Sequence, residues 1–164
     1  MPTLTAEQAR QRFARERVAR LATVGAAADP AAGQPHLVPV VFALTTGDDG
    51  GSRDSGDTGG PGDTVVFAVD HKPKRSGRLR RLENIRANPA VCLLADGYDE
   101  DWDRLWWARA DGTARVLPPS DRSAAADLYV RLLADKYREQ YAGRPPRGPV
   151  VEITVSRWSG WRAT

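Results

Sequence analysis

The amino-acid sequence predicts one mainly β domain of the α+β class, in which about six antiparallel strands form a small barrel with helices at its margins. Three observations lead to this prediction. Short β-branched runs recur between turn signals. The helical segments are too few to cover both faces of a parallel sheet. An open sheet of this size would also leave two edges exposed to mispairing, and a barrel removes those edges.

The N-terminal third of the chain predicts one helix and two strands. The run Thr5-Ala6-Glu7-Gln8 has the form of a capping box, and the helix that it starts is expected to reach about Glu16. In residues 17–24 apolar and polar side chains partly alternate, which predicts the first strand. Residues 35–44 predict the second strand, although Pro39 has no backbone N–H to donate to a neighbouring strand. Such a proline indicates an edge strand, a bulge or a place where a ligand replaces the neighbouring strand.

The middle of the chain predicts a long loop, a strand and a second helix. Residues 45–63 contain seven glycines and five aspartates without an apolar residue, so they predict a flexible hairpin loop within a single domain of residues 1–164. Residues 64–70 predict the third strand. A helix from roughly 75 to 87 should follow, ending at Asn88-Pro89.

The C-terminal half predicts a strand hairpin, a helix and a last strand. Residues 91–95 and 105–116 predict the fourth and fifth strands as a hairpin. Ser120 is expected to cap a helix, and residues 150–155 predict the sixth strand, followed by a tail at 157–162. The apolar stripe expected on that helix comprises Ala125, Leu128, Tyr129, Leu132, Leu133 and Tyr137.

Composition narrows the class of protein. The chain has 164 residues, enough for one core, and its net charge of +3 with a pI near 9.3 permits nucleic-acid contact without requiring it. The single cysteine, Cys92, excludes an internal disulfide and fits a reducing cytoplasm. With no apolar run approaching the length of a membrane span, we expect a protein that is neither exported nor membrane-bound.

Several familiar chemistries lack their motifs. There is no phosphate-binding P-loop and no Gly-rich dinucleotide fingerprint between a strand and a helix. His36 and His71 stand far apart without a carboxylate at ligand spacing, so no metal site is expected. The acidic residues at 96–103 do not match a calcium loop, and a solvated hairpin tip is the favoured interpretation.

The strongest functional signal is a basic cluster directly after the third strand. Charge-assisted donors at a turn and helix start are what a phosphate-bearing ligand needs. A charge run can equally be a solvated helix face, and the sequence leaves both interpretations open. The cluster comprises Lys72, Lys74, Arg75, Arg78, Arg80 and Arg81.

Five tryptophans supply broad planar surfaces. Two are adjacent at Trp106-Trp107, and two more are Trp158 and Trp161. Tryptophans commonly belong to a core or a subunit interface. Together with a cationic turn, however, they could also flank a flat heteroaromatic ring that carries a phosphorylated tail.

Four stretches, in this order and spacing, give the chain a family resemblance. They are Arg17-Val18-Ala19-Arg20-Leu21-Ala22-Thr23-Val24, Pro35-His36-Leu37-Val38-Pro39-Val40-Val41-Phe42, Val66-Phe67-Ala68-Val69-Asp70-x-Lys72-Pro73-Lys74-Arg75 and Leu79-x-x-Leu82-x-x-Ile85-x-x-Asn88-Pro89. The chain resembles the split β-barrel flavin and deazaflavin oxidoreductases, related to pyridoxamine-phosphate oxidase. Within them it is most similar to the actinobacterial branch, of the PPOX class, that is assigned to the deazaflavin coenzyme F420.

The resemblance implies an FMN-binding split-barrel fold and a homodimer with two cofactor sites between the subunits. By similarity, the ring would lie along the second strand, the ribityl chain along the third, and the phosphate at the basic turn. The residues so implied are Val38, Pro39 and Val40 for the ring, Ala68, Val69 and Asp70 for the ribityl chain, and Lys72, Lys74 and Arg75 for the phosphate. Trp107 and Trp161 of a partner subunit would close the ring pocket.

The implied activity is hydride transfer between coenzyme F420 and an unsaturated small molecule, with the coenzyme carrying the reaction. The flavin branch tends to hold phosphate with an arginine on the second or third strand plus a serine or threonine; cations after the third strand favour the deazaflavin tail. No general acid emerges, because Tyr98, Tyr129 and His36 lack a visible orienting partner. Two alternatives stay open: an FMN flavoprotein, and a non-enzymatic module that binds a cofactor or nucleic acid.

Overall fold

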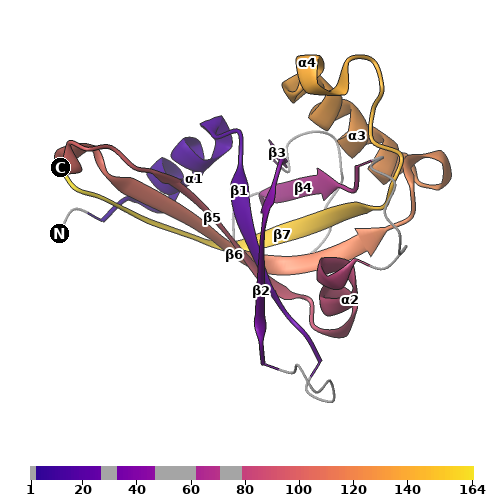
Figure 1. Ribbon diagram of the computed structural model, residues 1–164, viewed down its shortest axis with the longest axis horizontal. Coiled ribbons are helices and arrows are strands. Elements are labelled where there is room, and N and C mark those ends of the chain that lie inside the picture. The colour runs from indigo at the N-terminus through magenta and orange to yellow at the C-terminus, as the bar shows by residue number, and fades with distance from the viewer. Residues whose placement is uncertain (1–2, 27–32, 47–61, 71–78) are drawn as a thin grey trace.

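The computed structural model describes residues 3–26, 33–46, 62–70 and 79–164 (Figure 1). Within them the chain forms seven strands in one antiparallel sheet, in the order β2-β1-β5-β6-β7-β4-β3. The mainly β, α+β class is thereby confirmed, while the predicted count of six strands is wrong. The strands are β1 Ala19–Val24, β2 Pro35–Val40, β3 Ala43–Thr45, β4 Thr64–Ala68, β5 Ala90–Gly97, β6 Trp106–Leu117 and β7 Val150–Arg162.

The additional strand arises because the run 35–44 is divided. Its first part, β2, pairs with β1, whereas its second part, β3, pairs with β4 at the opposite edge of the sheet. Three peptide steps from Val40 to Ala43 span at most about 11 Å, so the sheet must curl until its two edges approach each other. Among the described strands no ladder joins β2 to β3. The sheet is therefore curled but open, and the prediction of a closed barrel is wrong.

A tyrosine supports the chain where it changes partners. Phe42 lies between β2 and β3, and its N–H donates to the Tyr137 hydroxyl at 3.1 Å. The hydroxyl in turn lies 3.0 Å from the carbonyl of Phe42 and 2.9 Å from that of Arg17. These contacts satisfy buried backbone groups outside the strand ladder, which would otherwise cost free energy.

The first helix matches its prediction. α1 spans Ala6–Arg15, Thr5 and Gln8 form the capping box, and Glu16 is the C-cap. Phe13 of α1 is fully buried and packs on Phe42, with the ring centroids 4.7 Å apart. Packing against β5, β6 and β7 places α1 over one part of the sheet (Figure 1).

The second helix, α2, spans Arg80–Ala87 and ends at Asn88 as predicted. It buries Leu82 and Ile85 against the sheet, and its buried Asn84 donates to Thr23 of β1 at 3.0 Å. It begins later than the predicted start near residue 75, because Leu79 is an extended N-cap rather than a helical residue. Residues 75–78 and most of the predicted loop at 45–63 lie outside the described residues.

The third helix begins later than predicted. Ser123, rather than Ser120, is the N-cap of α3 (Ala124–Lys136), and the short helix α4 (Arg138–Tyr141) follows. Ser120 instead begins a turn of 3₁₀ helix at Ser120–Arg122, like the other such turn at Trp102–Arg104. The buried stripe is rotated accordingly, and consists of Ala126, Val130, Leu133 and Tyr137, with Ala125 and Leu128 exposed.

The strand β4 separates two hydrophobic clusters. Val65 and Phe67 face the main core with α1 and α2, while Val66 and Ala68 face the cluster beneath α3. Because both faces are covered, all of β4 is buried, as is Val69 directly after it, and the chain reaches the surface at Asp70.

The last strand is longer than predicted, because the tail at 157–162 continues it to Arg162. β7 pairs with β6 along its length, with a register shift between Asp111 and Gly112. A Cβ at Gly112 would lie 2.4 Å from the carbonyl oxygen of Thr154, so this irregular position requires glycine.

Candidate functional site

A pocket of about 240 Å³ opens where the edge strand β2 passes the end of β4. Four of the residues predicted to bind a cofactor line it together, namely Pro39, Val40, Ala68 and Asp70. The other lining residues are Val18, Val41, Phe67 and Arg81. The sheet's curl creates this site, since β2 and β4 approach each other although they are not paired.

Pro39 is tolerated here because β2 is an edge strand. It stands opposite Arg20 of β1 and is exposed on the outer side of the sheet. Of the three possibilities that this proline predicted, an edge, a bulge or a ligand in place of a strand, the edge is confirmed, and Pro39 also lines the pocket.

Two other predicted residues lie beside the pocket without lining it. Val38 is partly buried against the main core. Val69 is buried in the same core, and its N–H donates to the Pro149 carbonyl at 3.0 Å. Both residues therefore belong to the hydrophobic core next to the pocket.

Arg81 is the cationic residue of the pocket. It comes from the first turn of α2, and its buried Nε has no hydrogen-bond partner among the described residues. Burial lowers the pKa of Arg81 from its ordinary value, while the charge of Asp70 acts in the opposite direction. A half-buried guanidinium at a pocket wall provides a position for an anionic or oxygen-rich group.

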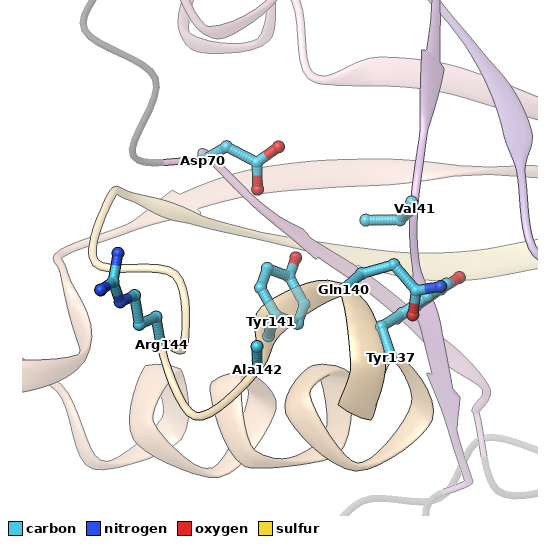
Figure 2. Close-up of a pocket in the computed structure, with 7 residues that line it drawn as sticks. All are labelled: Val41, Asp70, Tyr137, Gln140, Tyr141, Ala142 and Arg144. Carbon is cyan, nitrogen blue, oxygen red and sulfur yellow. The ribbon is translucent and has the colours of Figure 1, made fainter.

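A larger pocket of about 570 Å³ adjoins the first (Figure 2). The two share Val41 and Asp70, so they are adjacent, and together they are called the groove below. The remaining lining residues come from the end of α3, from α4 and from the turn after it: Tyr137, Gln140, Tyr141, Ala142 and Arg144.

The charge of Asp70 affects the pKa values of one side chain in each pocket. Its carboxylate acts on Arg81 in one pocket and on Tyr141 in the other. Burial, with the charge of Asp70 and the neighbouring Tyr137, raises the pKa of Tyr141 to about 12. The Tyr141 hydroxyl therefore remains a hydrogen-bond donor at physiological pH.

Sequence reasoning missed part of this groove. Arg81 belonged to the basic cluster but was not among the predicted cofactor-binding residues, and Tyr137 was assigned only to an apolar stripe. Tyr141 and Arg144 follow α3 without any motif. Only the folded chain brings this segment beside Val41 and Asp70 (Figure 2).

The other five predicted cofactor residues fall into two groups. Lys72, Lys74 and Arg75 lie outside the described residues. Trp107 and Trp161 stand directly opposite each other on β6 and β7. That end of the sheet is close to the C-terminus, whereas β4 points away from it (Figure 1). Their predicted role in closing the ring pocket of a partner subunit stays a prediction.

Among the described residues, no cluster of three histidine, cysteine or carboxylate side chains could hold a metal ion. None of the helices in the described part of the chain has the length and apolarity that crossing a bilayer requires.

A curled antiparallel sheet with a groove beside its edge strand defines a split-barrel class of protein. The chain belongs to the pyridoxamine 5'-phosphate oxidase family, whose profile matches residues 5–162. The sequence-based resemblance is thereby confirmed at the level of the family. A comparison with curated proteins found no match.

Solved structures show the same fold. A FAD-binding protein of Mesorhizobium loti is 20% identical with a TM-score of 0.61, over 96% of this chain and 94% of that one. A conserved hypothetical protein of Mycobacterium tuberculosis is also 20% identical, with a TM-score of 0.63 over 98% and 85%. The heme storage protein of Vibrio cholerae is 14% identical, with a TM-score of 0.61 over 97% and 95%.

Proposed function

We propose that this protein is a coenzyme F420-dependent oxidoreductase that transfers a hydride between the deazaflavin and an unsaturated small molecule. The observation that carries the proposal is the single pocket in which Pro39, Val40, Ala68 and Asp70 meet Arg81. Four of these residues were selected from the sequence, and they come from segments that are far apart along the chain. Membership of the pyridoxamine 5'-phosphate oxidase family supports a redox coenzyme at this place.

The residues present fit such a coenzyme. The edge strand at Pro39 and Val40 would face its ring, and the end of β4 at Ala68 and Asp70 would follow its polyol chain. The guanidinium of Arg81 at the pocket wall suits an oxygen of that chain or of the phosphate beyond it. When bound, the coenzyme supplies a ring that carries a hydride, and the protein supplies orientation and electric field.

A second copy of the chain is part of the proposal. The outward face of β2 is exposed, with Leu37 at 65%, and it continues into the 37% exposed Val18 at the rim of the pocket. An apolar edge strand of this kind is suited to burial against another subunit. We propose a homodimer in which each groove is completed by its partner, and we place the protein in the cytoplasm because its one cysteine calls for no oxidising compartment.

The first alternative is an FMN-dependent flavoprotein. It is favoured by the fold shared with the FAD-binding proteins of Mesorhizobium loti and Mycobacterium smegmatis, the latter 16% identical with a TM-score of 0.53 over 99% of this chain and 98% of that one. A flavoprotein would purify yellow. A deazaflavin protein would purify colourless and change the fluorescence of added coenzyme.

The second alternative is a module without catalysis, which stores a cofactor or binds nucleic acid. The fold shared with the heme storage protein of Vibrio cholerae supports a storage role. The basic cluster supports a nucleic-acid role, which requires an affinity that falls steeply with salt concentration. Binding that is insensitive to salt would exclude the nucleic-acid role.

The test of the proposed function is a titration of the purified protein with coenzyme F420 and with FMN, followed by fluorescence. We expect F420 to bind more tightly. Replacing Lys74 or Arg81 by alanine should weaken binding by about 1–3 kcal/mol, the range for a charged hydrogen bond. Arg86→Ala is the matched control, because Arg86 is an exposed arginine in the last turn of α2 and lines none of the groove.

Equal affinity for the two coenzymes would contradict the assignment to F420. Equal losses in the Arg81 and Arg86 variants would show that Arg81 contributes only general charge. In that event the pocket at β2 would not be the coenzyme site.

A further inference from the structure

A further pocket, of about 430 Å³, lies between α1, the start of β6 and the end of β7. These three elements meet near the C-terminus, at the end of the sheet away from α3 and α4 (Figure 1). The pocket shares no lining residue with the groove, and its size falls in the range of small-molecule sites. We call it the arginine pocket, because Arg12, Arg15 and Arg162 line it.

The sheet forms one wall of the arginine pocket. Trp106 and Arg162 stand opposite each other on β6 and β7, so their side chains leave the same face of the sheet. That face is the one that α1 covers, because a Cβ at Gly160, two residues before Arg162, would lie 3.2 Å from the Cβ of Ala9. On the other side of Trp106, a Cβ at Gly97 would collide with the indole ring, so the ring lies against the backbone of β5.

The helix α1 forms the other wall. Gln8, Arg12 and Arg15 follow one another at i, i+4 and i+7, which places them on one side of the helix, while Ala9 and Phe13 are its buried residues. The guanidinium of Arg12 lies over the ring of Trp106, 5.4 Å from its centroid. This cation–π contact joins the two walls and fixes the position of the Arg12 charge.

The arginine pocket has an excess of positive charge. Arg12, Arg15 and Arg162 form no ion pair with any described residue. Glu16 is the one carboxylate among the residues that line the pocket. Three guanidinium groups against one carboxylate leave a net charge of about +2, which favours a ligand with two negative charges.

A phosphate monoester matches this charge better than a carboxylate does. It carries a charge of about −1.5 to −2 at neutral pH and presents three acceptor oxygens, whereas a carboxylate carries one charge on two oxygens. The planar guanidinium group of arginine binds phosphate through two parallel hydrogen bonds. Leu4 and Trp106 add apolar surface beside the cations, which suits the organic part of an ester.

We propose that the arginine pocket binds an organic phosphate monoester, whose phosphate group is held by Arg12, Arg15 and Arg162. This site is additional to the proposed coenzyme site, because none of its residues lines the groove. The inference therefore does not depend on which coenzyme the groove binds.

The test is a calorimetric titration of the full-length protein with 1-naphthyl phosphate. Two matched probes, 1-naphthoate and inorganic phosphate, separate the contributions of the phosphate group and of the organic group. We expect saturable binding of 1-naphthyl phosphate, about tenfold tighter than that of either matched probe, as one additional charged hydrogen bond provides. Absence of saturable binding, or equal affinity for either matched probe, would overturn the proposal.

Substitutions locate the bound phosphate. Arg15→Glu should weaken binding of 1-naphthyl phosphate at least tenfold, because it replaces an attracting charge by a repelling one. Arg86→Glu is the matched control, since Arg86 is exposed in the last turn of α2, as Arg15 is in the last turn of α1, but does not line the pocket. Equal losses in these two variants would show that only the overall charge of the protein matters, and would refute the site.

A second variant keeps the test decisive if Arg15→Glu fails to fold. Arg162 is exposed at the end of β7, so Arg162→Glu should fold and lose affinity to the same extent. Unchanged binding in either folded variant would overturn the proposal.

The arginine pocket is also separable from the coenzyme site. Binding of 1-naphthyl phosphate should persist in Arg81→Ala, and coenzyme binding should persist in Arg15→Glu. If the affinity for 1-naphthyl phosphate falls in Arg81→Ala but not in Arg15→Glu, the phosphate binds in the groove and the proposal is wrong. Loss of coenzyme binding alone would refute the proposed function and leave the arginine pocket in place.

Discussion

At the scale of single residues, the groove and its surroundings are organised by side chains that are buried next to charge. Lys136 is the clearest example outside the groove. Its ammonium donates to the Glu16 carbonyl at 2.8 Å and lies 3.8 Å from the centre of the Phe42 ring. Burial, followed by repulsion from Arg17, lowers the pKa of Lys136 to about 8, although Glu16 acts in the opposite direction.

This pKa predicts a pH dependence of stability. Because the pKa is lower in the folded chain than in the unfolded one, the unfolded chain binds more protons between about pH 8 and pH 10.5. The free energy of unfolding should therefore rise with pH across that window relative to Lys136→Met, which lacks the titrating group. Chemical denaturation of both proteins at pH 7, 8.5 and 10 measures the difference. A constant difference between the two would contradict the lowered pKa.

At the scale of elements, Tyr137 connects the end of α3 to the break between β2 and β3. This contact supports the chain at Phe42, where it leaves β2 at one edge of the sheet and enters β3 at the other. The break brings Val41 into the groove, so the same tyrosine stabilises the fold and shapes the site. Sequence periodicity identified Tyr137 as an apolar helix residue but could not show what its hydroxyl contacts.

We predict that Tyr137→Phe destabilises the protein by about 1–3 kcal/mol, because the buried N–H of Phe42 loses its acceptor. Urea denaturation measures the change. Tyr98→Phe, at an exposed position, should leave the stability nearly unchanged. If the two variants are equally stable, the hydroxyl of Tyr137 does not support the strand break.

At the scale of the whole molecule, the exposed edge of the sheet borders the proposed coenzyme pocket. β2 contributes Pro39 and Val40 to the pocket's wall, and the exposed residues of β2 are Pro35, Leu37 and Pro39, which are apolar. Burial of this face against a second copy would enclose the pocket as well as remove an aggregation-prone edge. Dimer formation and coenzyme binding should therefore depend on the same surface.

We predict that Leu37→Lys prevents formation of the proposed dimer and weakens coenzyme binding. Leu37 is 65% exposed on β2, and a buried lysine there would lack a partner. Leu128→Lys is the matched control on α3, where the leucine is 49% exposed and remote from β2. Sedimentation velocity and fluorescence titration measure the two effects. A monomeric unmodified protein, or a dimeric Leu37→Lys variant, would refute this arrangement.

The sequence predicted local features well where the signal is local. The Thr5 capping box, the end of α2 at Asn88 and the β5–β6 hairpin each depend on neighbouring residues, and all three were confirmed. The N-cap at Ser123 was missed, because Ser120 and Ser123 offer the same side chain and only the packing of Val130 and Leu133 selects the helical phase. The length of β7 was missed, because its pairing partner β6 lies far away in sequence.

The sequence by itself determined the mainly β class, narrowed Pro39 to an edge, a bulge or a ligand-facing position, and selected Pro39, Val40, Ala68 and Asp70, which the structure places in one pocket. It could do so because strand periodicity and proline chemistry act over a few residues. Only the tertiary structure decided that run 35–44 breaks at Phe42, and that Arg81, Asp70 and Tyr141 share one groove. Those positions follow from the curl of the sheet and the packing of α3 on β4, which join residues that no local pattern relates.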